Sequence, residues 1–298
     1  MILKPAKLLL GAAVILVSHR AVAQDSDLLK GVVDTLPKKE KVYNAFKSSR
    51  VIMSQSMETL QPGVLDFRIL HRFGNVNSGA GEFFGLDQAS IRLGLDYGVT
   101  DDLSIGVGRG SYRKELDGFL KYRLLHQSTG PASIPFSLVG VVGSTIITGS
   151  FTGIQQGHGF SSRVAYYYQG ILGRKFNERL TLQVAPILLH RNFVETSADP
   201  NDMFATGFGG RIKLSHRVSL NVDYYYVFNQ NEARHVHNPL SIGFDIETGG
   251  HVFQLHFTNA IGMNERAFLT ETTNDWGDGG IQFGFNISRA FQLKKRRG

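Results

Sequence analysis

The sequence has no cysteine in its 298 residues, and it has eight prolines and one tryptophan. The absence of cysteine excludes disulfide bonds, thiolate-ligated zinc, iron–sulfur clusters and a cysteine nucleophile. No apolar run approaches the roughly 20 residues that a membrane-spanning helix needs. A disulfide scaffold and a helical-bundle membrane protein are therefore excluded, and we expect neither a cofactor nor a metal site.

Glycine and aromatic residues are abundant instead. The chain contains 34 glycines, 21 phenylalanines and 10 tyrosines, while hydrophobic residues make up 42% and charged residues 19%. Glycine relieves crowding at bends, and aromatic side chains fill the faces of pleated sheets. This composition is typical of a many-stranded antiparallel sheet and not of a disordered chain.

The basic isoelectric point, near 9.5, comes from the two ends of the chain. Residues 1–23 contain three basic residues and no acidic one, and residues 294–297 add four more basic residues. The rest of the chain has 25 basic and 25 acidic residues. A balanced body does not provide the phosphate-binding surface of a nucleic-acid-binding protein, so we expect no nucleic acid partner.

Residues 1–23 have the pattern of a secretory signal peptide. Lys4 and Lys7 precede the apolar run Leu8–Val17, and Ala21–Ala23 supplies the small residues that a signal peptidase accepts. The run is too short to span a membrane as a helix. We therefore expect cleavage after residue 23 and export, the alternative being a buried N-terminal helix.

From Gly63 onward, apolar and polar residues alternate with a period of two, which predicts β-strands. In 87–98, for example, Ile91, Leu93 and Leu95 share one face, while Arg92 and Asp96 share the other. We predict twelve strands, at 64–73, 87–98, 103–110, 115–125, 136–146, 162–174, 179–191, 205–214, 218–228, 240–247, 251–259 and 281–291. Residues 25–60 are charged with weak helical spacing, and we expect a short strand at 50–54.

The connections between these strands alternate in length. Five of the odd-numbered gaps are long and polar, with 111–114 as the exception, and most even-numbered gaps are tight turns. This asymmetry is typical of bacterial outer-membrane barrels, whose strand number is even. We therefore predict an all-β fold, an antiparallel transmembrane outer-membrane β-barrel of about twelve strands at 62–292. Residues 24–61 would form an N-terminal periplasmic or plug segment, and 293–298 a basic C-terminal tail. The alternative is a secreted soluble β-protein.

The apolar faces of the predicted strands suit contact with lipid. Tyr97, Tyr122, Tyr224 and Tyr226 lie near strand ends, where aromatic rings favour the headgroup level of a bilayer. We expect outer-membrane lipid as a partner. The barrel-assembly machinery is a second expected partner, because the last strand ends near the aromatic residue Phe291.

Charges of both signs lie on the opposite, inward faces. They predict either a polar passage for solutes or a salt-bridged interior that holds a small barrel together. We expect Arg68, Arg92 and Arg123 to pair with Asp66, Asp96, Glu115 or Asp117 on adjacent strands. The predicted lumen charge network consists of Asp66, Arg68, Arg72, Arg92, Asp96, Glu115, Asp117, Lys121 and Arg123.

Four stretches resemble a known family. They are His71–Gly74, Phe83–Asp87, Ile91–Gly98 and Asp117–Tyr122. In these stretches the sequence is similar to a family of uncharacterised Bacteroidota proteins described as membrane-bound β-barrel domains of unknown function. The resemblance is strongest over 45–125. It implies a membrane barrel and offers no catalytic residue to carry over.

Candidate catalytic and metal-binding residues are few. His190 near a strand end, with Ser161, Ser162 or Asp202 in neighbouring loops, could form a rim site in a barrel enzyme. His235 and His237 alternate in a predicted loop but have no third ligand nearby. We therefore predict no catalytic residues and interpret the loop histidines as solvated.

The function that the sequence favours is a narrow channel for small solutes in the outer membrane. The first alternative is a non-conducting structural barrel that binds partner proteins. The second is a lipid-acting barrel enzyme. A channel predicts conductance in planar bilayers, and a structural barrel predicts co-purifying partners without conductance. A barrel enzyme predicts a rim serine or histidine whose loss abolishes turnover without unfolding the barrel.

Overall fold

The computed structural model describes residues 38–150, 159–230 and 235–294. The predicted signal peptide and residues 295–298 of the basic tail lie outside the described residues. Among the described residues, no helix combines the length and apolar character needed to cross a membrane.

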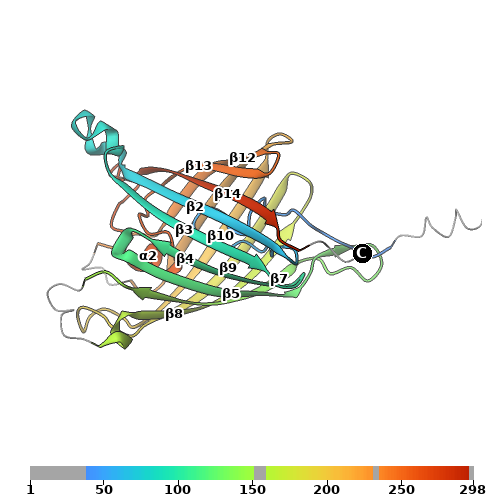
Figure 1. The fold of residues 1–298 in the computed structure, drawn as a ribbon, viewed down its shortest axis with the longest axis horizontal. Helices are drawn as coiled ribbons and strands as arrows, with labels where there is room; N and C mark the ends of the chain where they lie inside the picture. Colours follow the sequence, from blue (N-terminus) through green and yellow to red (C-terminus); the bar gives the residue numbers. More distant parts are fainter. Residues whose placement is uncertain (1–37, 151–158, 231–234, 295–298) are drawn as a thin grey trace, which may run out of the picture. The chain divides into compact units, whose positions relative to one another are not determined.

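Twelve antiparallel strands form one closed barrel, in agreement with the predicted fold (Figure 1). Each strand pairs with its neighbours in chain order, and the last strand, β14, pairs with the first, β2. The strands are β2 (Val64–Asn75), β3 (Ala89–Gly98), β4 (Leu103–Gly110), β5 (Glu115–Leu125), β7 (Ser137–Ile147), β8 (Val164–Lys175), β9 (Leu180–Arg191), β10 (Asp202–Lys213), β11 (Val218–Val227), β12 (Leu240–Thr248), β13 (His251–Thr258) and β14 (Gln282–Gln292).

The alternation in the sequence decides which side chains face outward. On β3, Ile91, Leu93 and Leu95 are 37–45% exposed on the outer face, while Arg92 and Asp96 are 1% exposed on the inner face. Successive side chains of a strand point to opposite faces, so one period-two pattern separates an apolar exterior from a charged lumen.

The two ends of the barrel differ, and we call them the turn end and the loop end. The turn end has the short connections, such as 99–102 and 249–250, together with the first residue of β2 and the last residue of β14. The connection after β5 is longer because β6 (Ser128–Thr129) pairs there with β1 (Glu40–Lys41). The loop end has the long connections, including 259–281.

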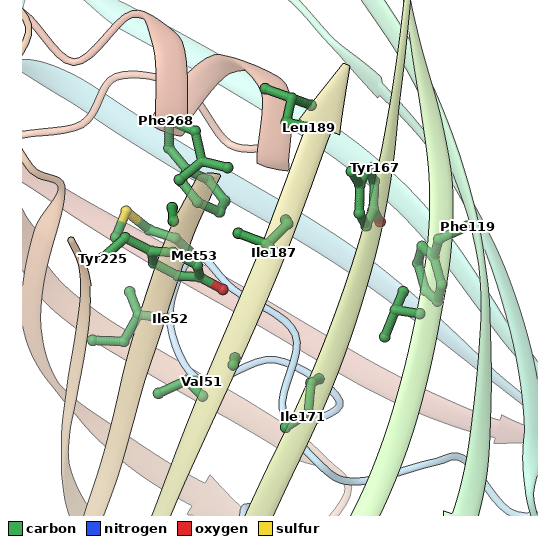
Figure 2. Packing of buried hydrophobic residues seen from close by; sticks show 14 of the residues in the cluster. Val51, Ile52, Met53, Phe119, Tyr167, Ile171, Ile187, Leu189, Tyr225 and Phe268 are labelled. Carbon is green, nitrogen blue, oxygen red and sulfur yellow. The ribbon is translucent and has the colours of Figure 1, made fainter. Parts of the chain in front are cut away.

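The hydrophobic core lies inside the barrel and not between two layers. Val51, Ile52 and Met53 pack against inward side chains of β7–β11, as Figure 2 shows. The predicted short strand at 50–54 is wrong. These residues form a tight turn in which Arg50 and Gln55 make one isolated bridge, and the N–H groups of residues 52–54 donate to a side chain of the barrel wall.

Candidate functional site in the barrel lumen

A segment of the chain that precedes the barrel fills part of the lumen. We call residues 45–58 the plug. The chain reaches it at the turn end, where the N–H of Val42 donates to the carbonyl of Gln127 at 2.8 Å. It leaves at the same end, where the hydroxyl of Thr59 donates to the carbonyl of Asp101 at 3.0 Å. The plug is therefore a loop that enters and leaves through one opening.

Asp223 on β11 anchors the tip of the plug. Its carboxylate accepts hydrogen bonds from the N–H groups of Ile52, Met53 and Ser54 at 2.8–3.2 Å, and from the Ser54 hydroxyl at 2.9 Å. Asp223 is fully buried. A buried carboxylate needs such donors because water no longer solvates it.

The carbonyl groups of the same turn are also bound. The side-chain amide of Gln254 donates to the carbonyl of Val51 at 2.6 Å, and that of Asn286 donates to the carbonyl of Ile52 at 3.1 Å. The wall thus provides acceptors for the N–H groups of the tip and donors for its carbonyls.

Lys121 on β5 anchors the two arms of the plug. Its ammonium group donates to the carbonyls of Ser49, Ser56 and Glu58 at 2.8–3.1 Å. An ammonium group has three donors and no acceptor, so these three carbonyls use all of its hydrogen-bonding capacity. Lys121 therefore holds together backbone from both sides of the tip.

The opposite side of the plug is apolar. Val51 and Ile52 lie near Ile171, Ile187 and the rest of a buried cluster on β7–β10 (Figure 2). Many inward side chains along these strands are apolar, but Gln183 on β9 also faces the lumen and accepts a hydrogen bond from the N–H of Met57 at 3.0 Å. The plug tip thus packs its apolar side chains on this part of the wall, while the plug backbone bonds to polar side chains around the lumen.

A second segment reaches the lumen from the loop end. We call residues 260–274, between β13 and β14, the insert. It contains the helix α2 (Glu265–Thr270), whose first turn is capped where Asn264 accepts a hydrogen bond from the N–H of Ala267 at 2.9 Å. All six residues of α2 are buried. Sequence reasoning missed this segment and treated 260–279 as a polar loop.

Ion pairs hold the insert in place. Arg266 pairs with Glu115 of the wall and, at 2.7 Å, with Glu271. Glu271 also pairs with Arg113 at 3.1 Å. Burial acts to raise the pKa of Glu271, but the Arg266 and Arg113 guanidinium groups, together with hydrogen bonds to the carboxylate, outweigh burial, so the pKa lies below the ordinary value. Glu271 is therefore ionised at neutral pH.

The plug and the insert meet in the middle of the lumen. The guanidinium of Arg50 in the plug lies 3.2 Å from the carboxylate of Glu265 in α2, and both side chains are 1% exposed. Arg50 also donates to the carbonyl of Met53 at 2.8 Å. One buried ion pair thus joins the two segments that fill the lumen.

All nine residues of the predicted charge network lie inside the barrel, each at most 5% exposed. Arg92 binds Asp117 through two nitrogen atoms, at 2.5 and 2.8 Å. Arg68 lies 3.6 Å from both Asp66 and Asp96. The partners belong to the predicted set, but only Arg68 with Asp96 joins adjacent strands as predicted. Asp66 shares β2 with Arg68, and Arg92 reaches Asp117 on β5 across β4, where Gly108 leaves room for its guanidinium.

The other predicted pairs differ. Arg123 lies 3.4 Å from Glu58 of the plug, and Glu115 binds Arg266 of the insert. Arg72 donates to the amide oxygen of Asn286 at 3.1 Å. The prediction failed for Arg123 and Glu115 because their partners lie on two segments that the strand pattern does not place in the lumen, whereas Arg72 bonds to a neighbouring barrel strand, β14.

The rim candidates do not assemble into a catalytic or metal site. His190 contacts Asp202 at 2.7 Å, but in the described part of the chain no serine hydroxyl bonds to this pair, and Ser162 donates to the carbonyl of Gly159. His237 lies 3.8 Å from Asp275. No group of three metal-ligating side chains occurs within 38–150, 159–230 and 235–294.

Comparison with known proteins identifies one family. The sequence profile of a family described as a membrane-bound beta barrel domain (DUF5777) matches residues 46–291. The match begins inside the plug. A search of curated proteins gives no match.

Solved structures with a similar fold include two porins and a channel. The NanC porin has 8% identity and a TM-score of 0.49, over 78% of this chain and 100% of that chain. The KdgM porin has 7% identity and a TM-score of 0.44, over 78% and 99%. An outer membrane channel from Pseudomonas putida F1 has 14% identity and a TM-score of 0.46, over 79% and 98%.

Proposed function

Because the chain belongs to the family of membrane-bound β-barrel domains, we propose that it is an outer-membrane channel for small solutes that its own plug closes. The signal-peptide pattern at 1–23 supports export, and exported barrels with an apolar exterior insert into the outer membrane. Short turns face the periplasm in such barrels, so the turn end and the base of the plug would face the periplasm. The barrel-assembly machinery would insert it.

The observation that carries this proposal is the path of the plug. Its two ends leave the lumen through the same opening, at Val42 and Thr59. A loop of this kind can withdraw as a unit without threading a chain end through the barrel. Withdrawal would leave a passage lined on one side by the charges of β2, β3 and β5 and accessible to water and small polar solutes.

A non-conducting structural barrel is the alternative, and one observation favours it. The inward faces of β7–β10 carry Val139, Val141, Ile171 and Ile187, which are at most 4% exposed while the plug covers them. Exposing this surface to water would cost free energy, about 25 cal/mol for each Å² of apolar area. A plug that never leaves would avoid that cost.

A reversible lock of the plug distinguishes the two proposals. A Cβ atom added to Gly209 would lie 3.0 Å from Cγ2 of Val51. Cysteines at these two positions are within reach of one disulfide, whose Cβ atoms lie roughly 3.5–4.5 Å apart. The chain has no native cysteine, so no other crosslink competes.

We expect single-channel recordings in planar bilayers to show intermittent openings of the wild type. The oxidised Val51→Cys/Gly209→Cys variant should be silent, and dithiothreitol should restore its openings. The single variants Val51→Cys and Gly209→Cys are the controls and should not respond to the reductant. If folded wild type and the reduced variant are both silent, the structural barrel replaces the channel. If the oxidised and reduced variants conduct equally, the current does not depend on plug movement.

The proposed lipid-facing surface leads to a second prediction. Leu93 lies at the middle of β3, and its side chain is 45% exposed on the apolar exterior. Leu93→Arg would place a charge near the centre of the bilayer, at a cost of about 2–4 kcal/mol of folding free energy. Val99→Arg, just beyond the end of the same strand, should cost at most about 1 kcal/mol because charges near the interface are tolerated.

Unfolding in urea with lipid vesicles would measure both costs. The heat-modifiable mobility of the barrel on gels would report the folded fraction. Equal destabilisation by the two substitutions would contradict the depth assigned to Leu93.

A further inference from the structure

We infer that the loop end of the lumen holds a binding site for a neutral carbohydrate of one or two rings. The site is a cavity of about 540 Å³, which we call the vestibule. This inference rests on the proposed channel, for which the vestibule would select the solute. Its lining includes Asn75, Gln88, Tyr112, Arg113, Glu271 and Gln282.

The vestibule is built from well-fixed parts of the barrel. Asn75 ends β2, Gln88 precedes β3, and Gln282 begins β14, so three adjacent segments supply amide side chains to one cavity. Glu271 belongs to the insert and also lines the cavity. The volume lies within the roughly 300–1,000 Å³ range of small-molecule sites.

Two side chains of the lining, Asn75 and Gln282, have polar atoms without partners. Gln282 is 3% exposed, and its amide oxygen has no hydrogen-bond partner among the described residues. The same holds for the amide oxygen of Asn75, whose nitrogen donates to Asn274 at 3.0 Å. Buried polar groups are normally bonded, so an unpartnered amide oxygen in a cavity lining is available to a bound water or ligand.

The turn between β4 and β5 is held in a strained conformation beside the vestibule. Arg113 and Lys114 have φ angles of 47° and 51°, in the left-handed region that residues other than glycine rarely adopt. The N–H of Lys114 bonds to the carbonyl of Ser111 at 3.1 Å, and Arg113 pairs with Glu271. This conformation places Tyr112 and Arg113 in the vestibule wall.

The chemistry of the lining favours hydroxyl groups as ligands. Each amide side chain both donates and accepts hydrogen bonds, as a sugar hydroxyl does. Arg113 is already paired with Glu271 at 3.1 Å, so these two lining charges balance and do not favour an anion. Tyr112 supplies an aromatic surface of the kind that packs on the C–H face of a sugar ring.

A glycan array tests the inference with the full chain in detergent. We expect binding to one or more neutral mono- or disaccharides, and none to inorganic phosphate in a parallel titration that follows the fluorescence of Trp276. Gln282→Ala should weaken saccharide binding about tenfold, since it removes a buried partner of the ligand. Gln292→Ala, at the opposite end of the same strand, is the matched control and should leave binding unchanged.

The heat-modifiable mobility of both variants would show that they fold. Absence of saccharide binding by folded wild type would overturn the inference, as would binding of phosphate alone or equal affinity of the Gln282→Ala and wild-type proteins. The disulfide lock is measured without saccharide, so the proposal of a channel and the inference of a saccharide site are tested separately. A conducting protein that binds no saccharide refutes only the vestibule, and a silent protein that binds one refutes only the channel.

Discussion

Asp223→Asn should release the plug and convert brief openings into a sustained current. The carboxylate accepts four hydrogen bonds from residues 52–54, and hydrogen bonds to a charged group contribute about 1.5–3 kcal/mol each. Three of these bonds end on one carboxylate oxygen, and the fourth, from the Ser54 hydroxyl, ends on the other. An asparagine can keep the three backbone bonds with its amide oxygen, but it removes the negative charge that strengthens them. A loss of about 1 kcal/mol from each of the three bonds would destabilise the closed state by about 3 kcal/mol, or about a hundredfold in the ratio of open to closed channels.

Single-channel open probability is the measurement. Ser90→Ala is the control, because Ser90 on β3 faces the same lumen, is 8% exposed, and its hydroxyl bonds to no plug residue among the described residues. Lys121→Met provides an independent check, since it keeps the side-chain length and removes the donors to three carbonyls of the plug. An Asp223→Asn protein that folds and opens as rarely as the wild type would show that the tip contacts do not keep the channel closed.

The barrel itself follows from local sequence. On β3, alternation of Ile91, Arg92 and Leu93 is enough to define a strand and to assign its two faces. Neighbouring strands are paired in chain order, so a contact such as Arg68 on β2 with Asp96 on β3 could be expected from the positions of the strands. The fold could be predicted because every strand carries its own signal and pairs with the next.

The contents of the lumen could not be predicted in this way. The N–H of Ile52 binds Asp223, which lies 171 positions away, and no periodicity links the two. Arg50–Ser54 therefore resembled a short strand, although its hydrogen bonds go to side chains of the wall. In the insert, Ala267, Phe268 and Leu269 form an apolar group within a long polar loop. Together with the apolar stretch 260–263, this group is a local sign that the loop turns inward.

The charge network likewise has contacts within the barrel wall, which could be predicted, and contacts to the plug and the insert, which could not. Its members that pair within β2–β5 have partners close in sequence, whereas Arg123 and Glu115 use partners on the plug and the insert. Charges facing a lumen are therefore not evidence for an open passage by themselves. On β5, Glu115, Lys121 and Arg123 bind the segments that close it, so three charges predicted to line a passage contact the material that fills it.

Breaking the Arg50–Glu265 pair is expected to have the second large effect. In the Glu265→Gln variant the Arg50 guanidinium stays buried without a carboxylate partner. It keeps its hydrogen bond to the Met53 carbonyl, and its carbon atom Cζ lies 5.8 Å from the centre of the Phe119 ring. Removing one partner of a buried pair costs about 3–5 kcal/mol, because the remaining charge is uncompensated. The plug should then withdraw more often, and trypsin should cleave after Lys47 and Arg50, which the wild type protects.

A double-mutant cycle separates this pair from general damage to the lumen. The charge reversal Arg50→Glu with Glu265→Arg should recover much of the protection that each single substitution loses. Glu82→Gln, in an exposed loop, is the control and should match the wild type.

Because Glu265 and Glu271 lie on the same insert, the Arg50–Glu265 pair also connects the plug with the vestibule. A coupling energy near zero between positions 50 and 265 would mean that plug and insert close the lumen independently, and that occupation of the vestibule cannot reach the plug through this contact.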